Sequence, residues 1–203
     1  MRPAFTIRGR KFKGLRGWAG KPFHPPLTDI PIGAYIIAAT LDVISFVGQD
    51  ESWATEVYRA ATYVFTAGLV VSVFTALTGF WDWWRSTEPG TQARRTANAH
   101  GLAMVAVTLI VVANVLLRWF AYYDDAHTGA VILVLSVVAA LLVTFGAALG
   151  GELVFDYGFN VETAGDSPVW HRSETDVLPG HPDVAEPAAA DPAAPTESTP
   201  LRS

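Results

Sequence analysis

The sequence contains no cysteine, and charged residues make up only 16% of its 203 positions. Without cysteine the chain cannot form a disulfide framework, hold an iron–sulfur cluster through thiolates or attach a c-type haem. It also lacks a glycine-rich phosphate loop, an HExxH pair and a nucleophile with a neighbouring base, so we do not expect an enzyme that acts alone. The net charge of −5 arises mainly from the C-terminal tail and gives no indication of nucleic-acid binding.

Apolar residues, in contrast, are abundant and clustered. They form 51% of the chain and gather in four stretches, of which the last three each exceed the roughly 20 residues that cross a hydrocarbon core. The first stretch is shorter, but Pro25 and Pro26 suit a first helical turn, so we predict a helix over residues 24–46 with a kink at Pro31. The sequence therefore predicts an all-α, four-helix transmembrane bundle. The four stretches are 32–47, 57–81, 97–120 and 129–154.

The flanking segments predict three regions and an orientation. Residues 1–23 form a basic segment, residues 24–161 the transmembrane domain, and residues 162–203 an acidic tail rich in alanine and proline, which we expect to be disordered. Lysine and arginine are found before the first stretch and between the second and third, but not in the other two loops. The positive-inside rule then places both termini in the cytoplasm, and we expect the plasma (inner) membrane as the location. A cleaved signal peptide is the weaker alternative, since Asp42 interrupts the apolar run.

Polar residues within the apolar stretches are informative, because each is costly in hydrocarbon unless it is paired or hydrated. Eighteen residues separate His24 from Asp42, and the same number separates His100 from Arg118. This is about five whole helical turns, so each pair lies on one face of its helix. If these helices are neighbours, the two histidines meet at the cytoplasmic level and Asp42 meets Arg118 at the outer level. Asn114 lies one turn from Arg118 on nearly the same stripe.

Two interpretations apply to the outer residues. We favour a structural ion pair between Asp42 and Arg118, and a proton or ion path that uses these residues is the alternative. Glu152 and Asp156 lie at the cytoplasmic level and are expected to be structural polar residues. The hydroxyl residues Ser45, Ser72, Thr75 and Ser136 are interpreted as groups that bond to the helix backbone.

The histidines allow three interpretations. His24 and His100 either cap helices and form interfacial hydrogen bonds, or ligate the iron of a b-type haem, or bind a metal ion together with an acid such as Asp82. In the haem interpretation, aromatic residues on the cytoplasmic side, Trp81 and Trp84 among them, line the pocket; an interfacial aromatic belt is the simpler interpretation of those residues.

Small residues predict where helices approach closely. Gly146 and Gly150 are four positions apart in "TFGAALGGE", which is the spacing that allows a close helix contact near the cytoplasmic end of the fourth stretch.

Five motifs together resemble a known family. "HPPLTDIPIG", Asp42, "TGFWDWW", "RRTANAHG" and "GGELVFDYG" are similar, in order and spacing, to a bacterial family of four-helix membrane proteins classed as a domain of unknown function. The resemblance covers residues 23–161. Members are sometimes fused to Rieske or c-type cytochrome domains, which implies a place near membrane electron transfer. This chain has no such domain, and Tyr157 stands where many members have a histidine. The residues that match the family pattern are His24, Asp42, Asp82, His100, Gly151 and Glu152.

From these observations we expect a non-catalytic membrane subunit or anchor near a redox complex. A haem b electron carrier with bis-histidine ligation is the alternative, and a small transporter is a third, which the lack of evident inverted repeats disfavours. The expected partners are the lipid bilayer and either a membrane redox complex or a second copy of the chain.

Overall fold

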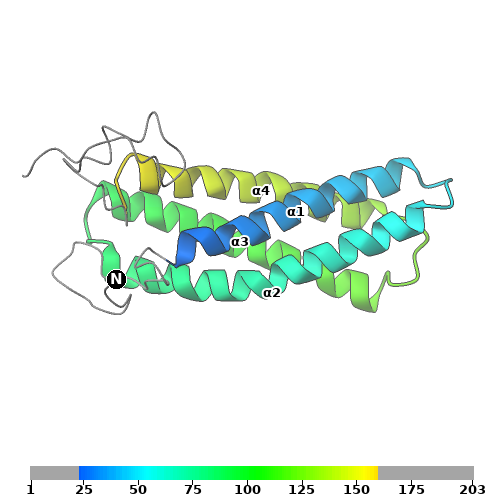
Figure 1. Ribbon diagram of the computed structural model, residues 1–203, viewed down its shortest axis with the longest axis horizontal. Helices are drawn as coiled ribbons and strands as arrows, with labels where there is room; N and C mark the ends of the chain where they lie inside the picture. The colour runs from blue at the N-terminus through cyan, green and yellow to red at the C-terminus, as the bar shows by residue number, and fades with distance from the viewer. Residues whose placement is uncertain (1–22, 160–203) are drawn as a thin grey trace, which may run out of the picture. The chain divides into compact units, whose positions relative to one another are not determined.

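The computed structural model describes residues 23–159, which form four helices joined by short connections (Figure 1). The all-α, four-helix prediction is confirmed, and all four helices are long and apolar enough to cross a membrane. The predicted acidic tail lies outside the described residues, as does the predicted basic segment apart from Phe23. The helices are α1 (His24–Val47), α2 (Ala54–Ser86), α3 (Gln92–Phe120) and α4 (Ala130–Phe155).

The helices pack around a common core in the order α1, α2, α3, α4, and α4 closes the ring against α1. α1 and α3 therefore lie diagonally across the bundle and are not the packed neighbours that the sequence reasoning assumed. Figure 1 shows α1 beginning at the end of the bundle where α2 connects to α3 and α4 finishes. We call this end, which carries His24 and His100, the histidine end. The opposite end, which carries Asp42 and Arg118, is the ion-pair end.

The outside of the bundle is as apolar as the inside. Large side chains such as Leu102 and Leu141 are about 70% exposed, which would be unfavourable in water but suits contact with lipid chains. Inside, Tyr35 stacks on Phe65 with ring centres 5.7 Å apart. Buried valines and alanines of all four helices complete the core: Ala38, Ala61, Val107, Val111, Val115, Ala139 and Val143.

Two helices extend further than the apolar runs indicated. α2 continues to Ser86 because its last turns carry aromatic and charged residues that remain helical outside hydrocarbon. α3 begins at Gln92, where the hydroxyl of Thr91 accepts a hydrogen bond from the Arg94 amide at 3.1 Å and so caps the first turn. At about 1.5 Å per residue, the 33 residues of α2 span about 50 Å, well beyond a hydrocarbon core about 30 Å thick.

The start of α1 follows the prediction, and the helix continues through Pro31. Proline has no amide hydrogen, so the carbonyl of Leu27, four residues earlier, lacks its usual helical donor. The Thr75 hydroxyl of α2 lies 3.3 Å from that carbonyl and 3.2 Å from the carbonyl of Val71, and can donate to either. A neighbouring helix thus supplies the hydrogen bond that proline removes. The kink at Pro31 stays a prediction.

This contact leads to a first testable prediction. Thr75→Val should lower the free energy of unfolding by about 1 kcal/mol, because it leaves the Leu27 carbonyl without a donor in apolar surroundings. In a Pro31→Ala background the new amide can bond to that carbonyl, so the same substitution should cost clearly less. Unfolding in mixed detergent micelles measures both values. Thr144→Val is the control, since this exposed hydroxyl bonds only to its own helix; equal costs in the two backgrounds would contradict the assignment.

Candidate functional site

The ion-pair end holds a buried charge pair. Asp42 and Arg118 are both completely buried, and Arg118 Nη2 donates directly to Asp42 Oδ2. Arg118 makes three further hydrogen bonds: Nε donates to Asn114 Oδ1 at 2.5 Å, Nη1 to Thr62 Oγ1 at 3.1 Å and Nη2 to Ser136 Oγ at 3.2 Å. The guanidinium therefore meets acceptors from all of the other helices as well as from its own.

The carboxylate of Asp42 is also satisfied on both oxygens. Thr128 Oγ1 donates to Oδ1 at 2.9 Å, and Ser136 Oγ lies 2.5 Å from Oδ2. Ser45, one turn after Asp42, accepts from the Thr128 amide at 3.0 Å and donates to the Ala54 carbonyl at 2.9 Å. This second layer ties the connections at the ion-pair end to α1. A charge pair that is buried and fully hydrogen-bonded in this way is suited to holding helices together.

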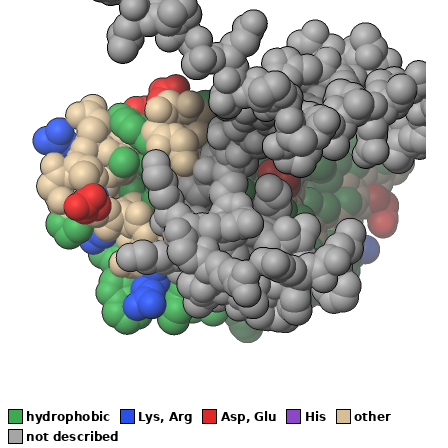
Figure 2. Space-filling view, turned by 60° about the vertical axis from the view of Figure 1, so that its left-hand side comes forward, with side chains coloured by type: hydrophobic (Ala, Val, Ile, Leu, Met, Phe, Trp, Pro, Cys, Tyr) green, Lys and Arg blue, Asp and Glu red, His purple; other side chains and the backbone are tan. Residues whose placement is uncertain are grey.

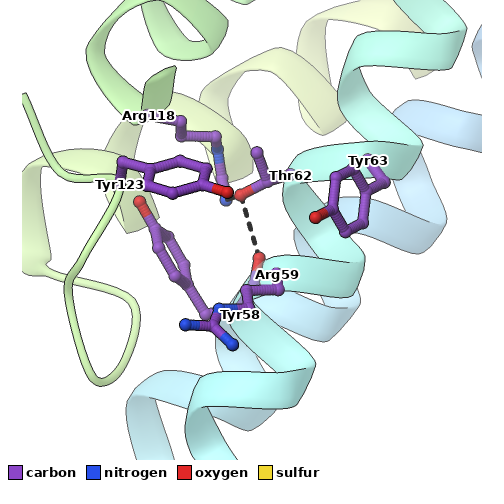
Figure 3. Close-up of a pocket in the computed structure, with 6 residues that line it drawn as sticks. All are labelled: Tyr58, Arg59, Thr62, Tyr63, Arg118 and Tyr123. Carbon is purple, nitrogen blue, oxygen red and sulfur yellow. Dashed lines mark hydrogen bonds between the residues drawn. The ribbon is translucent and has the colours of Figure 1, made fainter. Parts of the chain in front are cut away.

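Aromatic rings enclose the guanidinium. Arg118 Cζ lies 5.1 Å from the ring centre of Tyr58 and 5.2 Å from that of Phe65, within the range of cation–π attraction. Beside it is a cavity of about 10 Å³, which is close to the space that one water needs. Figure 3 shows the hydroxyl of Tyr123 directed toward Thr62 at this cavity. Its walls are Tyr58, Arg59, Thr62, Tyr63, Arg118 and Tyr123.

The histidine end holds two rings in matching environments. His24 Nδ1 lies 3.0 Å from the Thr75 carbonyl oxygen on α2, and His100 Nδ1 lies 2.8 Å from the Gly146 carbonyl oxygen on α4. A carbonyl can only accept, so Nδ1 is the donor in both rings. In a neutral imidazole this leaves Nε2 as the nitrogen with a free lone pair. Neither Nε2 makes a hydrogen bond within residues 23–159.

The two rings lie close together although they come from diagonal helices. Their centres are 6.4 Å apart and their planes are nearly perpendicular, at 80°. The 18-residue spacing thus did bring the histidines to one level and the ion pair to the other, although α1 and α3 are not adjacent.

Each histidine also packs against a glycine that lies four residues after its acceptor. A Cβ added at Gly79 would lie 2.5 Å from His24 Cε1, and one at Gly150 would lie 3.2 Å from His100 Cε1. The first distance is impossible and the second is tight, so both rings occupy space that larger residues would fill. This is the close approach that the Gly146 and Gly150 spacing predicted for α4, with a histidine ring as the group that uses the room.

Other predicted site residues lie elsewhere. Trp81 and Trp84 are exposed on the outside of α2, and the structure does not bring them to the histidines. Asp82 is buried on α2, yet no group of three or more His, Asp or Glu side chains in residues 23–159 could hold a metal ion. Glu152 accepts a hydrogen bond from the Tyr157 hydroxyl at 3.2 Å, and Asp156 follows the last residue of α4.

Several residues of both sites were not identified from sequence. The sequence alone did not indicate the roles of Thr62, Thr128 and the Phe65 ring at the ion-pair end, because these roles depend on which helices are adjacent. Ser136 was interpreted as bonding to the backbone; it does bond to the Ile132 carbonyl, and it also contacts Asp42. Gly79 lies four residues after Thr75 and therefore on the same face of α2, which was a further hint for the histidine end besides the 18-residue spacing.

Four long apolar helices with apolar outer surfaces define the class: a multi-pass membrane protein. Residues 20–163 match the family described as "Predicted membrane protein (DUF2231)", and the chain belongs to this family. The match includes the whole predicted transmembrane domain, residues 24–161. No curated protein and no solved structure matches the chain.

Proposed function

We propose that this protein is a membrane subunit that binds haem b and takes part in electron transfer, with His24 and His100 as the axial ligands. The short distance between the two ring centres carries the proposal. An imidazole nitrogen binds a metal at about 2 Å, so two rings on opposite sides of one ion have their centres about 6 Å apart. The separation in this structure is 6.4 Å.

The number of ligands favours haem over a bare metal ion. A structural or catalytic metal ion usually takes three or four protein ligands, whereas haem iron takes four nitrogens from its own macrocycle and needs two from the protein. Two histidines without a third His, Asp or Glu beside them in the described part of the chain agree with the second case.

The surroundings of the rings support the same ligand. Hydrogen bonds from Nδ1 to the carbonyls of Thr75 and Gly146 fix each ring and leave Nε2 for coordination, as second-shell contacts of histidine ligands do. The space at Gly79 and Gly150 is occupied by the imidazole rings themselves, so these glycines let each ring pack closely against a neighbouring helix. Interior sites of helical bundles are built from side chains on facing helices, and we infer that the two histidines form such a site.

Bound haem would supply a one-electron redox centre. The residues of the chain then bind and orient it, while the apolar core keeps water away from the side that faces the membrane interior. By the positive-inside rule the histidine end faces the cytoplasm, so electrons would be exchanged near that surface. The expected partners are the bilayer and a redox complex or second copy of the chain.

The other interpretations have less support. The subunit or anchor without a cofactor, which the sequence favoured, accounts for the hydrogen bonds from the histidines to α2 and α4, but it does not require the two ring centres to lie 6.4 Å apart. A transporter would need a hydrated path, but Ala38, Phe65, Val107 and Val111 fill the described core between the two polar ends.

The test is the visible absorption spectrum of the purified full-length protein, air-oxidised and dithionite-reduced, after expression with ample haem. We expect a Soret band that shifts on reduction and is lost in His24→Ala and in His100→Ala. His127→Ala is the matched control, because this histidine lies in the connection at the ion-pair end and should leave the spectrum unchanged. A colourless but folded wild-type protein would overturn the proposal and return the anchor as the better interpretation.

A further inference from the structure

The aromatic and basic residues at the end of α2 form a surface that the proposed haem site does not use. Trp81, Trp84 and Arg85 lie at positions i, i+3 and i+4, so they share one face of the helix. All three are exposed. Gly79 and Asp82, which are turned inward, lie on the other side of α2. We call these three residues the α2 clamp.

The arginine of the clamp is held by its two aromatic neighbours. Arg85 Cζ lies 5.9 Å from the Trp81 ring centre and 6.0 Å from that of Trp84. The two indoles are 5.9 Å apart and perpendicular, at 88°. Cation–π attraction to two rings restricts the guanidinium, so less conformational entropy is lost when it binds a further group.

The hydrogen-bonding groups of Arg85 find no acceptor in the described part of the chain. Within residues 23–159 its guanidinium makes no hydrogen bond and no ion pair. Arg94, on the neighbouring helix, differs: it lies 3.8 Å over the Trp83 ring and donates to the Trp83 and Thr87 carbonyls and to the Thr87 hydroxyl. Arg94 therefore joins α2 to α3, whereas Arg85 presents five N–H groups in a planar fork to the outside.

The position of the α2 clamp along the helix indicates which ligand it can bind. α2 is about 20 Å longer than the hydrocarbon core, so its final turns lie at the headgroup level. Tryptophan prefers this level, and a guanidinium there meets the phosphates of anionic lipids. Figure 2 shows basic side chains next to hydrophobic ones on the uncovered part of this end of the molecule. We propose that the α2 clamp binds the headgroup of an anionic phospholipid, with the indoles against its upper acyl region.

The test uses the full-length protein in detergent, titrated with phosphatidylglycerol or with phosphatidylcholine of the same chains and followed by native mass spectrometry. We expect wild type to prefer phosphatidylglycerol, and Arg85→Gln to bind it about fivefold more weakly. Arg59→Gln is the matched control: Arg59 is an exposed α2 arginine near the ion-pair end and should bind as wild type does. Trp84→Leu should also weaken binding.

Two results would overturn the proposal. One is equal binding of the two lipids to wild type. The other is unchanged phosphatidylglycerol binding in Arg85→Gln. Inorganic phosphate at millimolar concentration should not displace the lipid if the indoles contribute; displacement would assign the site to free phosphate instead. The far-ultraviolet circular dichroism of each variant checks that the overall helix content is unchanged. No outcome depends on haem, so this proposal and the proposed function can fail separately.

Discussion

Arg118→Met should lower the free energy of unfolding by about 3–5 kcal/mol, the largest effect we expect from any single substitution in the bundle. The change removes four hydrogen bonds and leaves the Asp42 carboxylate buried without its counter-charge. Asp42→Asn should be costly for the converse reason. Unfolding in mixed detergent micelles, followed by circular dichroism, measures both.

The double variant measures the interaction between Asp42 and Arg118 apart from the other contacts of each residue. Asp42→Asn combined with Arg118→Met leaves no unpaired charge, so its cost should be well below the sum of the two single costs. Arg59→Met provides the surface control: this arginine is half-exposed and 3.7 Å from Glu56, and we expect a change within about 0.5 kcal/mol. Additive single costs would show that the two charges do not stabilise each other.

Gly79→Val should abolish haem binding as completely as removal of a histidine, although it deletes no ligand atom. The new Cβ would overlap the His24 ring, which must then leave its place beside the Thr75 carbonyl. Overpacking of this kind also costs about 1–3 kcal/mol of stability. Two readouts therefore apply, the Soret band and the free energy of unfolding.

A second glycine supplies the control. Gly101 follows His100 directly on α3 and has open space at its Cβ position. Gly101→Val should keep the Soret band, with a small gain in helix stability because valine is a better helix former than glycine. If both valine variants retained haem, the tight packing at Gly79 would have no part in binding. If the wild-type protein binds no haem but Gly79→Val is still less stable, the close packing of His24 on Gly79 would be supported and its role as a haem ligand would be rejected.

The fold could be predicted from sequence because membrane helices leave a strong one-dimensional signal. The apolar runs predicted the four helices, and Pro25 with Pro26 predicted the start of α1. The ends of α2 and α3 could not be placed from the same signal. Residues 82–86 are polar or aromatic, and residues 92–96 are polar apart from Ala93. Both segments are nevertheless helical beyond the hydrocarbon, where hydropathy no longer reports on helix formation.

The sequence predicted which end of the bundle holds each site, but not all of the residues that form it. Helical spacing put His24 with His100 and Asp42 with Arg118, because rise per residue is nearly constant. The hydroxyl groups that complete each site depend on the order of the helices around the core. That order cannot be deduced from the sequence of any single helix. Neither Trp81 nor Trp84 lies at helical spacing from Gly79, and their exposure fits the interfacial belt, which was the simpler interpretation, better than the haem pocket.

The ion pair also constrains how the chain is made. Asp42 is on the first of the four helices along the chain and Arg118 on the third, while Ser136 is on the fourth. A charged side chain within a membrane helix raises the free energy of insertion, so we expect α1 to become fully stable in the bilayer only after α3 has been inserted. A chain that ends after α2 would lack the counter-charge of Asp42, and we expect it to be less stable in the membrane than the completed bundle.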